Sequence, residues 1–192
     1  MSVPPSAASA DPISVAAQAG SDEIILAARH KEADKIVYAI VENQRGVLHR
    51  ISGMFRAKGF NITSISIGGT SSPDLARMTI VPSGDEVALE LLVKQLRKMI
   101  DVIEVGVVTH ADAVVRELAL VKFETKSTRG KNAILDLSNA LGAKAVDTTH
   151  NSMVVEFCST PARIASFIAE ASKSAMVTDV VRTGLTALRR GL

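Results

Sequence analysis

The chain of 192 residues is long enough for one large domain or two small ones, and its 47% apolar content is typical of a globular protein. Aromatic residues make up only 3%, which disfavours a surface that stacks single-stranded nucleic acid, and a formal net charge of +2 does not indicate a polyanionic partner. Because Cys158 is the only cysteine, no internal disulfide can form, and we expect a reducing, cytoplasmic compartment. No apolar run reaches the ~18 residues of a membrane-spanning helix.

Residues 1–34 are rich in Pro, Ser and Ala and show no usable periodicity, which predicts a mobile N-terminal tail. This stretch lacks the basic start and the apolar run of a secretory signal. Its acidic residues, with no Lys or Arg before Arg29, also disfavour an organelle transit peptide.

A strand, a turn and a helix follow in residues 35–58. Residues 36–41 form a nearly unbroken apolar run, which predicts a strand covered on both faces. In the turn, Gly46 leaves the first N–H groups of the helix unshielded, and Asn43 offers an amide donor and acceptor. Such a turn can hold the carboxylate and ammonium of a free amino acid, whereas the alternative is a plain turn with a capping Asn. The helix has one apolar face at steps of three and four, formed by Val47, Leu48, Ile51, Met54 and Phe55.

The pattern continues as a complete β-α-β-β-α-β unit. Residues 62–67 and 75–81 alternate as two strands of a hairpin, separated by the turn cluster 70–74. Residues 83–86 resemble a capping box that opens a second helix, and residues 103–107 alternate as a fourth strand. This order predicts a split βαβ fold with antiparallel pairing and both helices on one face, so that something else must cover the other face.

A weaker unit of the same order starts at Val114. It comprises a strand at 118–123, a helix at 131–141 stopped by Gly142, a hairpin at 143–147 and 153–157, a helix opened by Thr160-Pro161, and a last strand from Val177. We therefore predict an α+β protein with two ferredoxin-like βαββαβ domains, related in fold but not in sequence.

Catalytic signals are weak. The histidines His30, His49, His110 and His150 are widely spaced and lack clustered partners, so we predict no metal site. There is no phosphate-binding loop and no dinucleotide-binding glycine turn. Cys158 follows an apolar strand pattern, which favours a structural role over that of a nucleophile. We expect this chain to perform no catalysis by itself.

Several segments match one known family in order and spacing: Asn43-x-x-Gly46-x-Leu48, Gly59-Phe60-Asn61-Ile62, Arg77-Met78-Thr79-Ile80, the run from Leu96 to Val105, Arg116-Glu117-Leu118-Ala119-Leu120-Val121-Lys122, and Gly184-Leu185. Together they closely resemble the regulatory (small) subunit of acetolactate synthase, also called acetohydroxyacid synthase, over everything except the tail. The resemblance implies an ACT regulatory domain at 35–110 and a C-terminal ferredoxin-like domain at 114–188.

The resemblance also implies a function in branched-chain amino-acid biosynthesis. The small subunit of this family has no active site; it activates a catalytic (large) subunit and confers feedback inhibition by a branched-chain amino acid, most often valine. Thiamine diphosphate, Mg and FAD are expected only in that catalytic partner, and neither nucleic acid nor membrane is expected as a partner. The alternative is a stand-alone ACT-type amino-acid sensor acting on another partner, although no DNA-reading helix-turn-helix pattern is present.

In the family, ACT domains pair through sheet or helix edges as a homodimer, and the effector lies at the pair interface. Such pairing would account for the burial that the first strand requires. One departure is His49, where the family pattern has Ser or Ala, and the tail is longer than usual. Carried over by position, the effector-binding residues are Asn43, Gly46, Val47, Leu48, Asn61 and Ile62.

Overall fold

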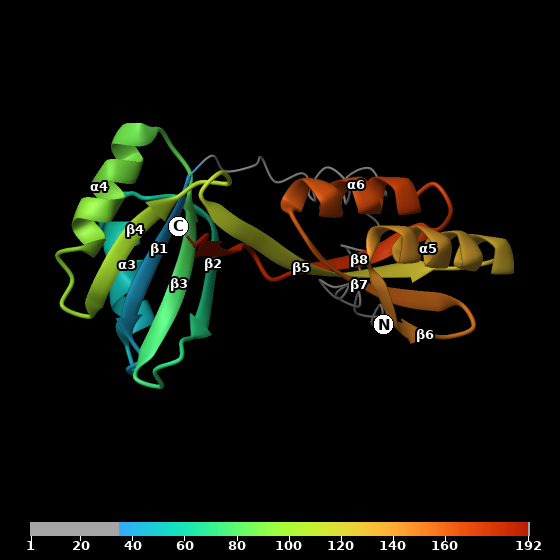
Figure 1. Cartoon of the computed structure of the whole chain (residues 1–192), viewed down its shortest axis with the longest axis horizontal. Helices are drawn as coiled ribbons and strands as arrows, with labels where there is room; N and C mark the ends of the chain where they lie inside the picture. The colour runs from blue at the N-terminus through green and yellow to red at the C-terminus, as the bar shows by residue number, and fades with distance from the viewer. Residues whose placement is uncertain (1–34, 192) are drawn as a thin grey trace, which may run out of the picture. The chain divides into compact units, whose positions relative to one another are not determined.

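The structure is a computed structural model, and it describes residues 35–191 (Figure 1). These residues form two compact units. Within the described range, the first unit contains residues 35–118 and 182–191, and the second contains residues 119–181. The tail predicted at 1–34 lies outside the described residues. In the part of the chain that the structure describes, no helix is long and apolar enough to cross a membrane.

The first unit is built on a four-stranded antiparallel sheet with the order β2-β3-β1-β4. Two helices, α3 and α4, lie on one face of this sheet (Figure 1). The predicted β-α-β-β-α-β order and antiparallel pairing are confirmed. In chain order the elements are β1 (Ile36–Glu42), α3 (Val47–Lys58), β2 (Ile62–Gly69), β3 (Leu75–Pro82), α4 (Glu86–Leu96) and β4 (Val102–Val108).

One detail at the start of α4 differs from the prediction. The N-cap is Asp85, whose carboxylate accepts a hydrogen bond from the Ala88 N–H at 2.9 Å. Ser83 lies two residues outside the helix, and its hydroxyl is 2.7 Å from that of Thr63. The predicted capping box is therefore replaced by a single aspartate cap, which also places a negative charge at the positive end of the helix.

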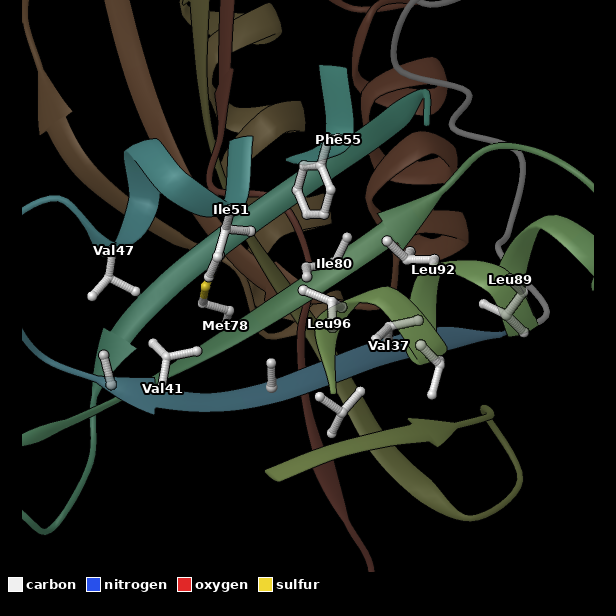
Figure 2. Packing of buried hydrophobic residues seen from close by; sticks show 14 residues of the cluster. Val37, Val41, Val47, Ile51, Phe55, Met78, Ile80, Leu89, Leu92 and Leu96 are labelled. Atoms are coloured by element: carbon white, nitrogen blue, oxygen red, sulfur yellow. The ribbon is translucent and has the colours of Figure 1, made fainter. Parts of the chain in front are cut away.

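The main core of this unit lies between the sheet and the two helices. Figure 2 shows side chains from α3 and α4 meeting those of β1 and β3. Ile51, Leu92 and Leu96 are fully buried, as the helical periodicity predicts for one apolar face. The cluster also includes Val37, Val41, Val47, Phe55, Met78, Ile80 and Leu89.

The opposite face of this sheet is covered by the same chain. Ile36 and Tyr38 of β1 pack with Val108 against residues from the start of β5 (Ala113–Glu124) and from β9 (Thr186–Arg189). The short strand β9 was not predicted, and it pairs with β5 in antiparallel register. The burial of the first strand therefore does not require a dimer partner, which corrects the explanation that the family resemblance offered.

The second unit repeats the topology with the strand order β6-β7-β5-β8. Its core includes the rings of Phe123, Phe157 and Phe167 and is closed by helices α5 and α6. The helix α5 starts earlier than predicted, because Ser127 is its N-cap, whereas Thr160 caps α6 as predicted. The remaining elements are α5 (Thr128–Leu141), β6 (Lys144–Thr148), β7 (Ser152–Ser159), α6 (Pro161–Ala171) and β8 (Met176–Arg182).

The side chain of Cys158 is exposed on β7, because strand alternation buries its neighbours Phe157 and Ser159. Cys158 is therefore not part of the core.

Candidate effector site

The turn between β1 and α3 presents an open helix N-terminus. Gly46 is the N-cap residue, with φ of 86°, and no side chain caps the helix. The residues from Asn43 to Gly46 are exposed. The Val47 N–H makes only a long contact of 3.4 Å to the Gln44 carbonyl. Because the first N–H groups of a helix carry partial positive charge, this turn is suited to bind an anion.

Asn43 connects the turn to the β2–β3 hairpin through two hydrogen bonds. Its side-chain Nδ2 donates to the Pro73 carbonyl at 3.0 Å, and its backbone N–H donates to the Asp74 carbonyl at 2.7 Å. One amide hydrogen is thus used within the chain, while Oδ1 accepts no hydrogen bond from residues 35–191. The free oxygen could accept from an ammonium group.

A guanidinium group from α3 lies over the turn. Arg50 donates two parallel hydrogen bonds to Asp101, from Nε at 2.7 Å and from Nη2 at 2.6 Å. The Asp101 side chain is 7% exposed, whereas that of Arg50 is 47% exposed. These hydrogen bonds from Arg50 lower the pKa of the Asp101 carboxyl below its usual value and keep it charged.

The third guanidinium nitrogen of Arg50 is not engaged by Asp101. Arg50 Nη1 lies 2.9 Å from the position that a Cβ would take on Gly46, and within the described residues it makes no hydrogen bond. Any side chain at residue 46 would therefore meet this nitrogen. The arrangement combines open helix N–H groups with a guanidinium donor, and both favour a carboxylate.

The apolar residues after the turn differ in their exposure. Val47 is 4% exposed and points into the core beside Ile51 (Figure 2), so that it can offer a ligand only its backbone. Leu48 is 51% exposed and adds an apolar surface next to the open N–H groups. His49 is exposed as well.

Asn61 and Ile62 lie at the other end of the same sheet. Glu42, which precedes the turn, pairs with Leu75 on β3, whereas Ile62 pairs with Pro82. The seven residue steps from Leu75 to Pro82 on β3 span roughly 24 Å at ~3.4 Å per step. A single chain therefore does not bring all six predicted residues together.

Comparison with known proteins identifies the family. The sequence model described as the AHAS small subunit-like ACT domain matches residues 37–104, and the one described as the small subunit of acetolactate synthase matches residues 116–191. A probable acetolactate synthase small subunit of Methanothermobacter thermautotrophicus is 38% identical over 81% of this chain and 92% of its own length. This chain belongs to the acetolactate synthase small-subunit family.

Two further relatives of this small-subunit family agree. The acetolactate synthase isozyme 3 small subunit of Escherichia coli is 33% identical over 82% of this chain and 96% of its own length. The crystal structure of the acetolactate synthase small subunit of Thermotoga maritima is similar with a TM-score of 0.76 at 28% identity, over 82% of this chain and 98% of that chain. The first unit thus contains the ACT domain of a small subunit, and the name of the family implies a large, catalytic partner.

Sequence reasoning missed the pair Arg50 and Asp101. Arg50 follows Gly46 by four residues, so helical spacing alone could have placed it above the turn. Asp101 lies 51 residues further along the chain, and only the packing of the loop after α4 brings it to β1, where its carbonyl also accepts the Glu42 N–H at 2.9 Å.

Proposed function

We propose that this small subunit activates a thiamine-diphosphate-dependent catalytic subunit and confers feedback inhibition by a branched-chain amino acid, valine in the first instance. The observation that carries the proposal is the uncapped N-terminus of α3, with Arg50 Nη1 above it and exposed Leu48 beside it. This combination fits a carboxylate next to a short aliphatic side chain. Asn43 Oδ1 supplies an acceptor for the ammonium group.

The effector site is completed by a second copy of the chain. In the sheet order β2 is an edge strand, and its Ile65 and Ile67 are 38% and 46% exposed. They pair with Ile80 and Met78, two residues of the core beneath the helices, so these exposed side chains lie on the helix face of the sheet. A long edge strand with exposed apolar side chains is a site for pairing with another chain.

Antiparallel pairing of two β2 strands around a twofold axis would bring the separated residues together. It would place Ile62 of one copy beside the Gly69 end of the other copy. Gly69 pairs with Ala76, and Val41 pairs with the same residue, so this is the end of the sheet that carries the Asn43 turn. Asn61 of one copy and the turn of the other would then line one site.

The proposed feedback inhibition follows from thermodynamic linkage between effector binding and the arrangement of the dimer. An amino acid that binds one arrangement of the regulatory dimer better than another shifts the dimer toward that arrangement, and the catalytic subunit responds with reduced activity. The ligand can shift the equilibrium only by the difference of its affinities for the two arrangements.

The test is reconstitution with an acetolactate synthase catalytic subunit. We expect the isolated chain to form no acetolactate from pyruvate, even with thiamine diphosphate and magnesium, but to raise the turnover of the catalytic subunit on mixing. Valine should then lower the rate at which the complex forms acetolactate. A mixture with unchanged turnover would refute activation, and an activated complex that valine does not inhibit would refute the effector assignment.

A further inference from the structure

A pocket lies on the face of the first unit's sheet opposite to α3 and α4. Its volume is about 300 Å³, and it is bounded by β2, β3 and the segment that leads into β9. Four hydroxyl-bearing residues, Ser66, Thr79, Thr183 and Thr186, line it with Arg77, together with Ile67 and the glycines Gly68, Gly69 and Gly184. It belongs neither to the Asn43 turn nor to the main core.

The position of the pocket follows from strand register. Met78 and Ile80 of β3 point into the core beneath the helices, so Arg77 and Thr79 point to the opposite face. Thr79 pairs with Ser66 of β2, and Arg77 pairs with Gly68. Because Gly68 has no side chain, the space beside Arg77 on this face stays open.

The remaining wall of the pocket is the segment 183–186, which lies close to β2. The hydroxyl of Ser66 donates to the Leu185 carbonyl at 2.5 Å. Gly184 has φ of 80°, and a Cβ at this position would clash with the hydroxyl oxygen of Ser64. A glycine is therefore required both by the backbone conformation and by the close approach of this segment to the sheet. The hydroxyl of Thr183 is engaged by the Leu118 N–H at 3.2 Å.

Arg77 brings an uncompensated positive charge to the pocket. Its guanidinium carbon lies 4.3 Å from the centroid of the Tyr38 ring, so one face is stacked on an aromatic group. Its Nε is buried without a hydrogen-bond partner, and within residues 35–191 no carboxylate forms an ion pair with it. Glu104 on the same face of the sheet instead accepts a hydrogen bond from the Tyr38 hydroxyl at 2.7 Å.

Thr79 adds a donor without a partner. Its residue is 2% exposed, and its hydroxyl makes no hydrogen bond to any of the described residues. Buried polar groups are nearly always hydrogen-bonded, so the buried Arg77 Nε without a partner, beside a hydroxyl that makes no hydrogen bond, indicates a ligand that accepts hydrogen bonds.

The geometry points to a second ligand site in this pocket, for a small oxyanion whose phosphate or carboxylate group pairs with Arg77 and accepts a hydrogen bond from Thr79. A guanidinium is permanently charged and presents a fork of donors to such groups. A volume of about 300 Å³ holds the anionic group and a small organic part attached to it. The site is separate from the amino-acid effector site and does not rest on the proposed function.

Titration of the full-length chain with phosphate, and in parallel with acetate, tests this site at constant ionic strength, with chloride as the reference anion. The readouts are isothermal calorimetry and the midpoint of thermal unfolding, because a ligand that binds only the folded state raises that midpoint. Wild-type protein should show saturable binding of at least one of the two anions. Tighter phosphate binding supports a phosphoryl ligand, and tighter acetate binding supports a carboxylate ligand.

Two variants locate the binding. Arg77→Gln should weaken it by roughly 10-fold or more, since hydrogen bonds to charged groups are the strong ones. Thr79→Val keeps the shape and removes only the unsatisfied hydroxyl, so it should fold normally and bind roughly two- to twelve-fold more weakly. Arg56→Gln removes one exposed charge from α3 on the other side of the sheet and should bind as wild type does.

The inference fails if neither anion binds beyond the chloride reference. It also fails if Thr79→Val and Arg77→Gln both bind the anion with wild-type affinity. None of these measurements contains valine or a catalytic subunit, so they succeed or fail independently of the regulatory proposal.

Discussion

At the scale of single residues, the turn before α3 is shaped by one glycine and one ion pair. Gly46 adopts a conformation that other residues rarely adopt, and this places the open N–H groups beside Arg50. Asp101 accepts hydrogen bonds from two of the three guanidinium nitrogens, and the third stays available as a donor. The proposed effector site thus has a fixed donor set in the absence of ligand, which would reduce the loss of side-chain freedom on binding.

The Asp101 carboxyl should contribute to the pH dependence of stability. Hydrogen bonds from Arg50 lower its pKa below the ordinary value of 3.8, so its contribution is present above that pH and is lost as the pH falls through the lowered pKa. Asp101→Asn removes this contribution. We expect the free energy of unfolding, measured with urea, to fall less between pH 5 and pH 2 in this variant than in the wild type.

Asp112 provides the comparison for this measurement. The backbone N–H and the hydroxyl of Thr109 lower the pKa of its carboxyl in the same direction, and it lies away from the turn. Asp112→Asn should also reduce the acid dependence while leaving valine binding unchanged. An acid dependence in Asp101→Asn equal to that of the wild type would show that the Arg50 pair contributes no stability.

Gly46→Ala should destabilise the protein. A left-handed backbone conformation costs a residue with a Cβ about 1–2 kcal/mol, and the new methyl group would also contact Arg50 Nη1. Urea unfolding at neutral pH measures the change. Gly53→Ala is the control, because this glycine lies inside α3 with open space around its Cβ position, and it should leave stability unchanged or raise it. Equal effects of the two changes would mean that the turn relaxes without strain.

At the scale of elements, the sequence predicted most strands and helices, since alternation and helical periodicity are local signals. The predicted turn at Asn43–Leu48 is confirmed as the start of α3. Local sequence signals did not predict the features that depend on tertiary packing. The strand β9 is only four residues long, and it is fixed by the packing of its Ala187 in the cluster that covers β1. Asp85 rather than Ser83 caps α4. Similarly, no pattern joins Arg50 to an aspartate 51 residues away.

The edge strand β2 should carry the dimer interface. Ile67→Asp places a charge on an exposed apolar position of this edge, so the monomer should fold normally while dimerisation weakens by roughly 100-fold or more, since an unpaired buried charge costs ~3 kcal/mol or more. Light scattering across a concentration series measures the dimer. Val87→Asp on α4 is the matched control, because Val87 is 74% exposed and lies away from β2. A variant Ile67→Asp that remains dimeric would place the interface elsewhere.

At the scale of the whole molecule, sensing and activation should be separable. Asn61 is exposed, and its side chain makes no hydrogen bond within the described residues, so Asn61→Ala should leave the fold and activation intact. Loss of one polar contact to the effector would raise the valine concentration for half-inhibition by roughly five- to 150-fold, or ~1–3 kcal/mol. Asn151→Ala makes the same change on an exposed loop of the second unit and should retain wild-type inhibition. Loss of activation together with inhibition would instead assign Asn61 a structural role.

The central claim is that each effector site takes its turn from one copy of the chain and Asn61 from the other. Asn43→Ala and Asn61→Ala homodimers should each respond weakly to valine. In a mixed dimer one of the two sites would carry both changes and the other would carry none, so random association of equal amounts restores roughly a quarter of all sites. Valine titration of the mixed and re-equilibrated subunits, bound to the catalytic subunit, is the most direct test. We predict that a fraction of wild-type sensitivity returns on mixing, whereas a mixture as insensitive as its two components would contradict a shared site.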